Sequence, residues 1–306
     1  MKHLSKYSQR SPRAQIVVVL ALTLPVLISA IAMSADVGVM YFNWQCLQSA
    51  ADAGAVAGAG YLPSNPSLAI STADLYVAKN GIVAGEITST TVATDDLSLN
   101  IQLKRTVPYS FALLLGLVSG TVSAQATAQI QSVGSTIGVK PVGIDYRQPY
   151  TAGQVVTFAQ GQAGPGNWGA LALGSTGAST FQQNIEYGAP GLVAVGDWVA
   201  TETGQMTGPT KNSFQYLINE GQNADSGATF ANHSATDPRV LIVPMVDFSS
   251  INGSSQVPVK GFAALWLVSA DSQDNITTYF IDQVAPGGTP KVSATNYGAY
   301  QAVLLQ

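Results

Sequence analysis

The sequence predicts an α+β protein with a transmembrane helix near its N-terminal end and a β-rich, sandwich-like domain at its C-terminal end. An uncharged apolar run from Ile16 to Ala35 predicts the transmembrane helix. The helical pattern continues into an alanine- and glycine-rich run that ends near Gly60. Beyond Pro141, short apolar runs alternate with turn residues, which is typical of a domain built from many short strands.

The first predicted elements are a basic tail, residues 1–15, and a transmembrane helix over residues 16–35, which would span roughly 30 Å. No Lys or Arg occurs between the tail and Lys79. Positively charged flanks remain in the cytoplasm, so this asymmetry predicts a cytoplasmic N-terminus, a membrane anchor and a body on the other side of the membrane. The basic residues of the tail are Lys2, Lys6, Arg10 and Arg13.

A cleaved secretory signal peptide is the alternative interpretation of the same run. Ala30, Ile31 and Ala32 form a small-residue site at which a signal peptidase could cut. The apolar run is longer than a signal-peptide core of about 7 to 15 residues, and the helical pattern continues past the site. The sequence therefore favours a permanent anchor and leaves cleavage as the second option.

Aromatic residues and then small residues follow the apolar run. Tyr41, Phe42 and Trp44 are predicted to lie at the membrane–water interface, where a ring buries its body and keeps its polar group hydrated. A face of small residues comes next and would allow another helix to approach closely. Its partner is either a domain of the same chain or a second copy of the helix. The residues of this face are Ala51, Gly54, Ala55, Gly58 and Ala59.

Three motifs along this helix match a known family. They are a Leu-Pro-Val-Leu step, an Asp-Val-Gly before an aromatic residue, and a Leu-Gln-x-Ala-Ala-Asp-Ala run. The matching residues are Leu24, Pro25, Val26, Leu27, Asp36, Val37, Gly38, Tyr41, Leu47, Gln48, Ala50, Ala51, Asp52 and Ala53. The segment resembles the N-terminal region of TadE/TadG-like Flp-pilus assembly proteins. A processed prepilin would carry Glu five positions after the small residue Ala14, where this chain has Val19. The resemblance therefore implies a permanently anchored, TadG-like protein of a bacterial inner membrane, with its body in the periplasm.

Residues 36–131 are expected to form the extended helix and a small α+β module. The phrases Val107-Pro-Tyr and Phe111-Ala-Leu-Leu-Leu-Gly are similar to the module that follows the anchor in TadG-like proteins, so the resemblance extends to about residue 130. The elements expected within the module are a helix over 67–79 with Ser67 as its N-cap, strands over 86–93 and 97–107, a helix over 109–117 and a strand over 118–131.

Residues 132–140 are predicted to be a Gly/Ser-rich linker, and residues 141–306 a β-rich periplasmic domain. The most apolar strands, 239–246 and 261–268, are expected to pair at its centre, and only residues 210–220 have a helical pattern. The other strands expected are 154–158, 169–173, 191–195, 256–259, 277–281 and 299–304.

Charge and residue types argue against several classes of function. The tail holds four of the 13 basic residues and none of the 17 acidic ones, which leaves 9 basic residues and a net charge near −8 for the remainder. This balance argues against nucleic acid as a partner. Cys46 is the only cysteine, so no intramolecular disulfide forms. His233 has neither metal-ligand spacing nor a nucleophile motif around it.

We therefore expect no cofactor, no metal site and no enzyme activity. A carboxylate pair for glycoside hydrolysis stays open, because only the fold would bring Glu186 close to Asp197 or Glu202.

Two functions from different classes follow. The first is a membrane-anchored, non-catalytic component of Flp/Tad-type pilus assembly or a related secretion apparatus. Its partners would be the lipid bilayer, other assembly proteins and, through the small-residue helix, a second copy. The alternative is a secreted or surface-anchored binding module, adhesin or lectin-like, in which Trp168 and Trp198 stack on sugars. Packing in the core or in a turn is the commoner role for such residues.

Overall fold

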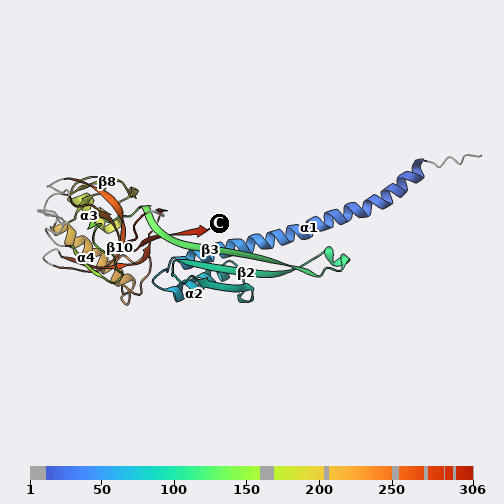
Figure 1. The fold of residues 1–306 in the computed structure, drawn as a ribbon, viewed down its shortest axis with the longest axis horizontal. Coiled ribbons are helices and arrows are strands. Elements are labelled where there is room, and N and C mark those ends of the chain that lie inside the picture. The colour runs from blue at the N-terminus through green and yellow to red at the C-terminus, as the bar shows by residue number, and fades with distance from the viewer. Residues whose placement is uncertain are drawn as a thin grey trace, which may run out of the picture.

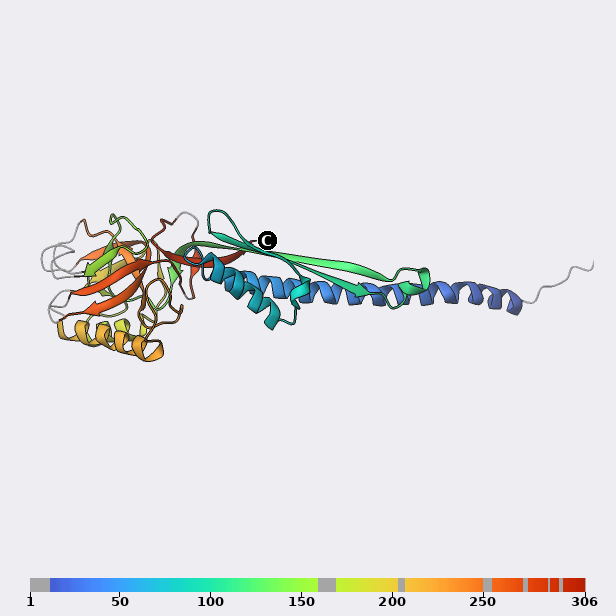
Figure 2. The same ribbon diagram turned by 90° about the horizontal axis from the view of Figure 1, so that it is seen from below.

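The computed structural model describes residues 12–158, 169–202, 207–249, 255–271, 275–285, 287–291 and 294–305. In these residues a long N-terminal helix runs into an elongated stalk, and a β-rich lobe lies at the far end (Figures 1 and 2). We call residues 40–136 together with residues 299–305 the stalk, and residues 137–298 the lobe. The arrangement confirms the predicted α+β fold with an N-terminal apolar helix and a β-rich C-terminal part.

Helix α1, Pro12–Ala59, is one element of 48 residues. Its helical rise makes it about 70 Å long. It joins the predicted transmembrane helix to the predicted extended helix and passes through Pro25 without a break. The hydroxyls of Ser29 and Ser34 donate to the carbonyls four residues earlier, at 2.7 and 2.9 Å. These polar groups are therefore satisfied within the helix itself.

The stalk packs a second helix and a three-stranded sheet against the C-terminal half of α1. The N-cap of helix α2 lies two residues earlier than predicted, because the Asn65 side chain accepts from the Leu68 N–H at 3.0 Å and Pro66 occupies the first helical position. The predicted N-cap at Ser67 is therefore wrong. The elements are α2 (Pro66–Lys79), a 3₁₀ turn η1 (Ala84–Glu86), β1 (Ile87–Val92), β2 (Ser98–Pro108) and β3 (Ser119–Thr136).

The small-residue face of α1 packs on its own chain. Ala51, Ala55 and Ala59 are completely buried, and they share a core with α2 and the inner face of β2 and β3. A Cβ atom on Gly54 would lie 2.6 Å from Val77 Cγ2, and one on Gly58 would lie 2.7 Å from the Ala69 carbonyl oxygen. This contact is therefore as close as two backbones allow. Of the two partners considered, the structure places the chain's own module on this face, which leaves no room there for a second copy.

Strand β3 connects the stalk to the lobe. It pairs with β2 over its first part, and its last residues pair with β7 (Val193–Ala194) and β13 (Thr289–Pro290) of the lobe. The predicted linker over 132–140 is therefore wrong in its first half, where the chain is still a strand.

The last strand of the chain, β14 (Ala299–Leu305), leaves the lobe and pairs antiparallel with β3 (Figure 1). The sheet order is β1-β2-β3-β14-β12, where β12 is Gln283–Val284. The end of the predicted C-terminal domain thus belongs to the sheet of the stalk. Two chain segments cross the boundary between stalk and lobe.

The lobe is built around a second sheet with the strand order β4-β9-β10-β11-β5. The predicted central pairing is confirmed, with Ala264 opposite Ile242. The two runs predicted over 256–259 and 261–268 form a single strand with an irregularity at Lys260. The strands are β4 (Ile144–Asp145), β5 (Val155–Phe158), β9 (Val240–Val246), β10 (Gln256–Ala270) and β11 (Ile276–Ile281), with β6 (Leu171–Ala172) and β8 (Trp198–Thr201) beside them.

Two helices cover one face of this sheet, whereas the sequence predicted one. Helix α4, Thr207–Ala224, contains the predicted segment, and α3, Ala178–Tyr187, lies beside it. Helix α3 has a weak sequence signal because it is only 10 residues long, with Phe181 and Ile185 as its buried apolar pair. The opposite face of the sheet packs against β6, β7, β8 and the start of β14.

A buried lysine lies where the chain enters the lobe. The Lys140 ammonium donates to the Glu186 carbonyl at the C-terminal end of α3, at 3.3 Å, and the residue is 8% exposed. Burial lowers the pKa of Lys140 to about 8, and the nearby Glu186 carboxylate opposes this effect. The charged form is therefore disfavoured in the folded state.

We predict that replacing Gly58 will loosen the stalk. In Gly58→Ala the new methyl group meets the Ala69 carbonyl oxygen, so the free energy of unfolding should fall by about 1–3 kcal/mol. The matched control is Gly38→Ala in the same helix, where nothing lies within 4 Å and stability should be unchanged or slightly higher. The measurement is the thermal midpoint of the full chain in detergent. Equal midpoints for the two variants would contradict the close packing.

We also predict that Lys140 makes stability depend on pH. The unfolded chain holds the proton up to about its ordinary pKa of 10.5, whereas the folded chain releases it near 8. Between these values the unfolded state binds more protons, so stability rises with pH. Lys140→Met should remove this slope and raise stability at pH 7 by about 1–3 kcal/mol. Thermal midpoints between pH 7 and 10.5 check this, and parallel curves for both proteins would contradict it.

Candidate functional site at the junction of helix and hairpin

The N-terminal half of α1 is uncovered by the rest of the chain. From Ile16 to Val39 its large apolar side chains are 45% to 72% exposed. The helix is long and apolar enough to cross a membrane. This is the one helix of that kind among the described residues. The predicted anchor therefore coincides with the part of α1 that the protein leaves bare.

The carboxylate of Asp36 holds the tip of the β2–β3 hairpin against α1. Asp36 is 5% exposed, and its two oxygens accept three backbone N–H groups. Ser110 donates at 2.8 Å, Phe111 at 3.0 Å and Ala112 at 2.7 Å. Hydrogen bonds to a charged acceptor are stronger than neutral ones, so the hairpin tip is fixed at this level of the helix. We call this contact the Asp36 clasp.

The hairpin tip, residues 109–118, contains a single 3₁₀ turn, η2 (Ala112–Leu115), in place of the helix predicted over 109–117. The turn is followed by Gly116 in the left-handed conformation, with a φ of 86°. The tip presents large apolar side chains outward, which are Phe111, Leu113, Leu114, Leu117 and Val118, at 44% to 86% exposed.

An apolar groove of about 470 Å³ separates the tip from the exposed part of α1. On the helix it begins at Ile28 and ends at Met40, and Asp36 lies within it. Tyr109, Phe111, Leu114 and Leu117 form the hairpin side. The groove, the tip and the bare helix thus form one continuous apolar surface.

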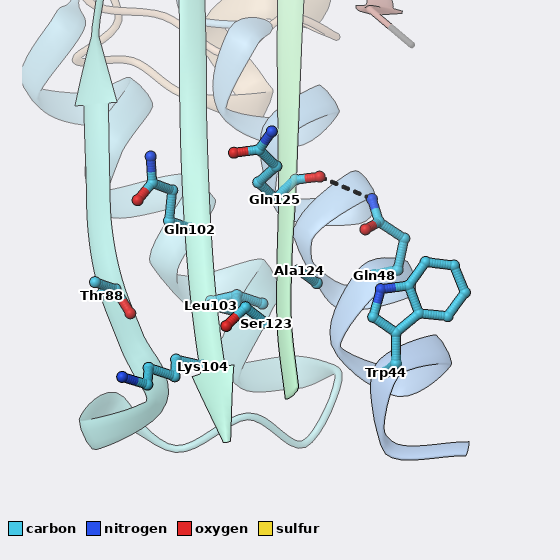
Figure 3. Close-up of a pocket in the computed structure, with 9 residues that line it drawn as sticks. All are labelled: Trp44, Gln48, Thr88, Gln102, Leu103, Lys104, Ser123, Ala124 and Gln125. Carbon is cyan, nitrogen blue, oxygen red and sulfur yellow. Dashed lines mark hydrogen bonds between the residues drawn. The ribbon is translucent and has the colours of Figure 1, made fainter. Parts of the chain in front are cut away.

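The three aromatic residues predicted at the interface lie just above the clasp. Tyr41 and Phe42 are 60% and 64% exposed, and the Tyr41 and Trp44 rings lie 5.8 Å apart. Trp44, 40% exposed, stands beside strand β3 at the edge of a shallow polar pocket (Figure 3). Within this pocket the Gln48 side chain donates to the Gln125 carbonyl at 2.9 Å (Figure 3). This hydrogen bond satisfies the Gln125 carbonyl, a backbone acceptor of β3 beside the helix.

An ion pair braces the hairpin further from the tip. The Arg105 guanidinium on β2 forms a two-pronged pair with Glu86, at 2.6 and 2.9 Å, and donates to Asn43 of α1 at 3.1 Å. The hydrogen bonds from Arg105 hold the pKa of Glu86 below its usual value, although partial burial opposes this. The brace and the clasp fix the hairpin to α1 at two levels.

The other residues singled out in the sequence lie elsewhere. Trp168 is outside the described residues, and Trp198 is 63% exposed on β8 of the lobe. The His233 ring lies against Trp266 in a tilted arrangement, 4.9 Å between centroids, and its Nδ1 lies 3.0 Å from the Thr229 carbonyl. Cys46 is half-buried on α1 with a free thiol. In the described part of the chain, no group of three or more His, Cys, Asp or Glu is placed to hold a metal ion.

The three candidate carboxylates hold local structure. Glu186 accepts from Gln182 and Ser213, Asp197 from the Ala194 N–H, and Glu202 from the Gly177 N–H before α3. None of these bonds joins one of the three to another.

The sequence analysis did not identify the hairpin tip as part of a site. Asp36 enters the sequence-based prediction only as part of the Asp-Val-Gly motif directly after the apolar run, and residues 109–117 are predicted there as a helix. One signal was available, because an exposed hairpin turn is normally polar and residues 106–139 contain no charged side chain. The contact between the two segments had no local signature.

No protein-family model matches the chain, and no curated protein or solved structure is significantly similar to it. The geometry of this junction is therefore the structural basis for a functional proposal.

We predict that the charge of Asp36 is needed to hold the hairpin tip. Asp36→Asn keeps the size of the side chain but turns an NH₂ group toward the same backbone donors. The amides of Ser110, Phe111 and Ala112 should exchange hydrogen at least about tenfold faster. The control is Asp52→Asn in the same helix, where the carboxylate bonds Gln48 and not the hairpin. Unchanged exchange at the three amides in Asp36→Asn would contradict the clasp.

Proposed function

We propose that this chain is a membrane-anchored, non-catalytic component of Flp/Tad-type pilus assembly or a related secretion apparatus. It would act through protein–protein contacts of its periplasmic stalk and lobe. The observation that carries the proposal is the division of α1 into two halves. One half is apolar and bare, and the other is packed into a stalk that holds the lobe away from it.

The bare half of α1 suits a lipid environment. Its hydroxyl groups are satisfied by the helix's own backbone, as Ser29 and Ser34 illustrate, so immersion in hydrocarbon leaves no unpaired donor on them. Exposing so much apolar surface to water would be unfavourable by about 25 cal/mol per Å². A bilayer removes that penalty without any further protein contact.

The charge pattern supports a cytoplasmic N-terminus. All four basic residues of the first fifteen precede the bare helix, and none follows it before Lys79. The stalk and lobe would then lie in the periplasm of a bacterial cell. Together with the resemblance of residues 14–130 to TadG-like proteins, this orientation supports an assembly role over a free binding module.

The construction of the stalk supports a positional role. Two strands, β3 and β14, run between stalk and lobe and pair with each other, so the lobe is held to the anchor by a sheet and not by a flexible linker. The Tyr150 hydroxyl donates a hydrogen bond to the Asp282 carboxylate at this boundary. Burial raises the pKa of Asp282, and the neighbouring Tyr150, Tyr300 and Ser64 hydroxyls oppose this effect. A lobe fixed in this way could present a surface at a set height above the membrane.

A single specific observation favours the alternative, an adhesin or lectin-like module. Trp198 is 63% exposed, so it does not have the core role that such residues usually have. An exposed indole can stack on a sugar ring.

The test combines topology with a phenotype in the source organism. In a Cys46→Ser background, Ser71→Cys should react with a membrane-impermeant maleimide added to the periplasm. Its matched partner Ser8→Cys should react only after lysis. Deletion of the gene should abolish surface pili or the secreted product, and the full chain should restore it. Normal pili in the deletion strain would overturn the assembly role. A released protein whose glycan binding is lost in Trp198→Ala would establish the alternative.

A further inference from the structure

We infer that the hairpin tip, residues 109–118, inserts into the extracytoplasmic leaflet of the bilayer beside the anchor helix. The partner of this surface is lipid hydrocarbon. The inference rests on the proposed anchoring of α1 in a membrane and goes beyond it, because an anchor helix alone does not require a second inserted element.

The depth of the tip along α1 is the first argument. The groove between tip and helix extends from Met40 down to Ile28, which lies eight positions before Asp36 and about 12 Å below it along the helix axis. Half of a hydrocarbon core is about 15 Å thick. If the anchor occupies residues 16–35, the tip lies within the upper half of the same layer.

The chemistry of the tip is the second argument. Leu114 is 86% exposed, Val118 69% and Leu117 56%, and they lie on a turn without a single charge. A leucine-rich turn of this kind in water would be an unfavourable apolar patch. Within the leaflet the same side chains are in their preferred solvent.

The backbone of the tip is the third argument. A turn immersed in hydrocarbon must satisfy its N–H groups without water. The Asp36 carboxylate accepts three of them, and carbonyls within the tip accept others, at 3.0 to 3.2 Å. The donors with a partner are Tyr109, Ser110, Phe111, Ala112, Leu114, Gly116 and Leu117.

This satisfaction gives Asp36 a physical reason to stand at the end of an apolar run. A free carboxylate at the edge of the membrane would be costly, as would three free N–H groups. The hydrogen bonds between the carboxylate and the N–H groups remove the desolvation penalty of both. The clasp therefore allows a short irregular segment to lie at a depth that normally admits only helices and closed barrels.

The experiment places an environment-sensitive NBD label at single cysteines in the full chain, reconstituted in phosphatidylcholine vesicles. The background is Cys46→Ser, and the sites are Leu114→Cys in the tip, Leu20→Cys in the anchor and Leu75→Cys in α2. Leu75 is the matched control, because it is a leucine of the stalk that is 52% exposed far above the clasp. Leu113→Cys provides a second tip site in case the first variant folds poorly.

We expect NBD at residues 114 and 20 to emit at shorter wavelength than at residue 75. Nitroxide-labelled lipid should quench both, while aqueous iodide should quench only residue 75. If residue 20 is quenched by lipid but residue 114 behaves as residue 75, the anchor stands and tip insertion is overturned. If residue 114 is shielded from both quenchers, a protein covers the tip and the lipid assignment is overturned. If lipid fails to quench residue 20, both the anchor and the insertion are overturned.

Discussion

The small-residue face of α1 packs directly against α2 and the β2–β3 sheet, and this close contact sets the geometry of the whole stalk. With Gly54 and Gly58 against α2 and the β2–β3 sheet, the helix and the hairpin run side by side at the shortest possible separation. That separation lets Arg105 reach Asn43 and lets Asp36 reach the hairpin tip. A larger residue at the glycines would move the hairpin away from the helix at every level below. The position of the apolar tip therefore depends on packing at Gly54 and Gly58, which lie well beyond Asp36 along the same helix.

Asp36 shows how one charge can serve two segments. On the helix it stands at the end of the apolar run. In the fold its two carboxylate oxygens accept three backbone N–H groups of a turn without charges. The carboxylate and the three N–H groups satisfy each other's hydrogen bonds without water, so the junction can lie in an apolar environment. Two apolar elements attached to one membrane would limit both the tilt and the rotation of the stalk. That restriction is what a protein needs if its role is to hold a lobe at a defined place.

The lobe is joined to this base by paired strands. Strand β14 returns from the end of the lobe to pair with β3, so force or motion at the lobe is transmitted through a hydrogen-bonded sheet. The charged residues inside the lobe have structural partners. Arg239 pairs with Asp237 at 2.8 Å, donates to the carbonyls of Gly221 and Asp225 at the end of α4, and stacks on Trp266. Such an arrangement stabilises the C-terminal end of the helix.

The sequence by itself determined the elements whose signal is local. The uncharged run gave the bare half of α1, alternation gave β2 and β3, and the apolar runs gave the central pair β9 and β10. Apart from the β9–β10 pair, it did not determine which distant segments meet. The partner of the Ala/Gly face, the return of β14 to β3 and the bond between Asp36 and Ser110 all join residues far apart in the chain. Periodicity and composition indicate which face of a segment is exposed to solvent and which face is buried. Only tertiary packing decides which distant segment fills that face, because several partners of equal polarity would satisfy the same pattern.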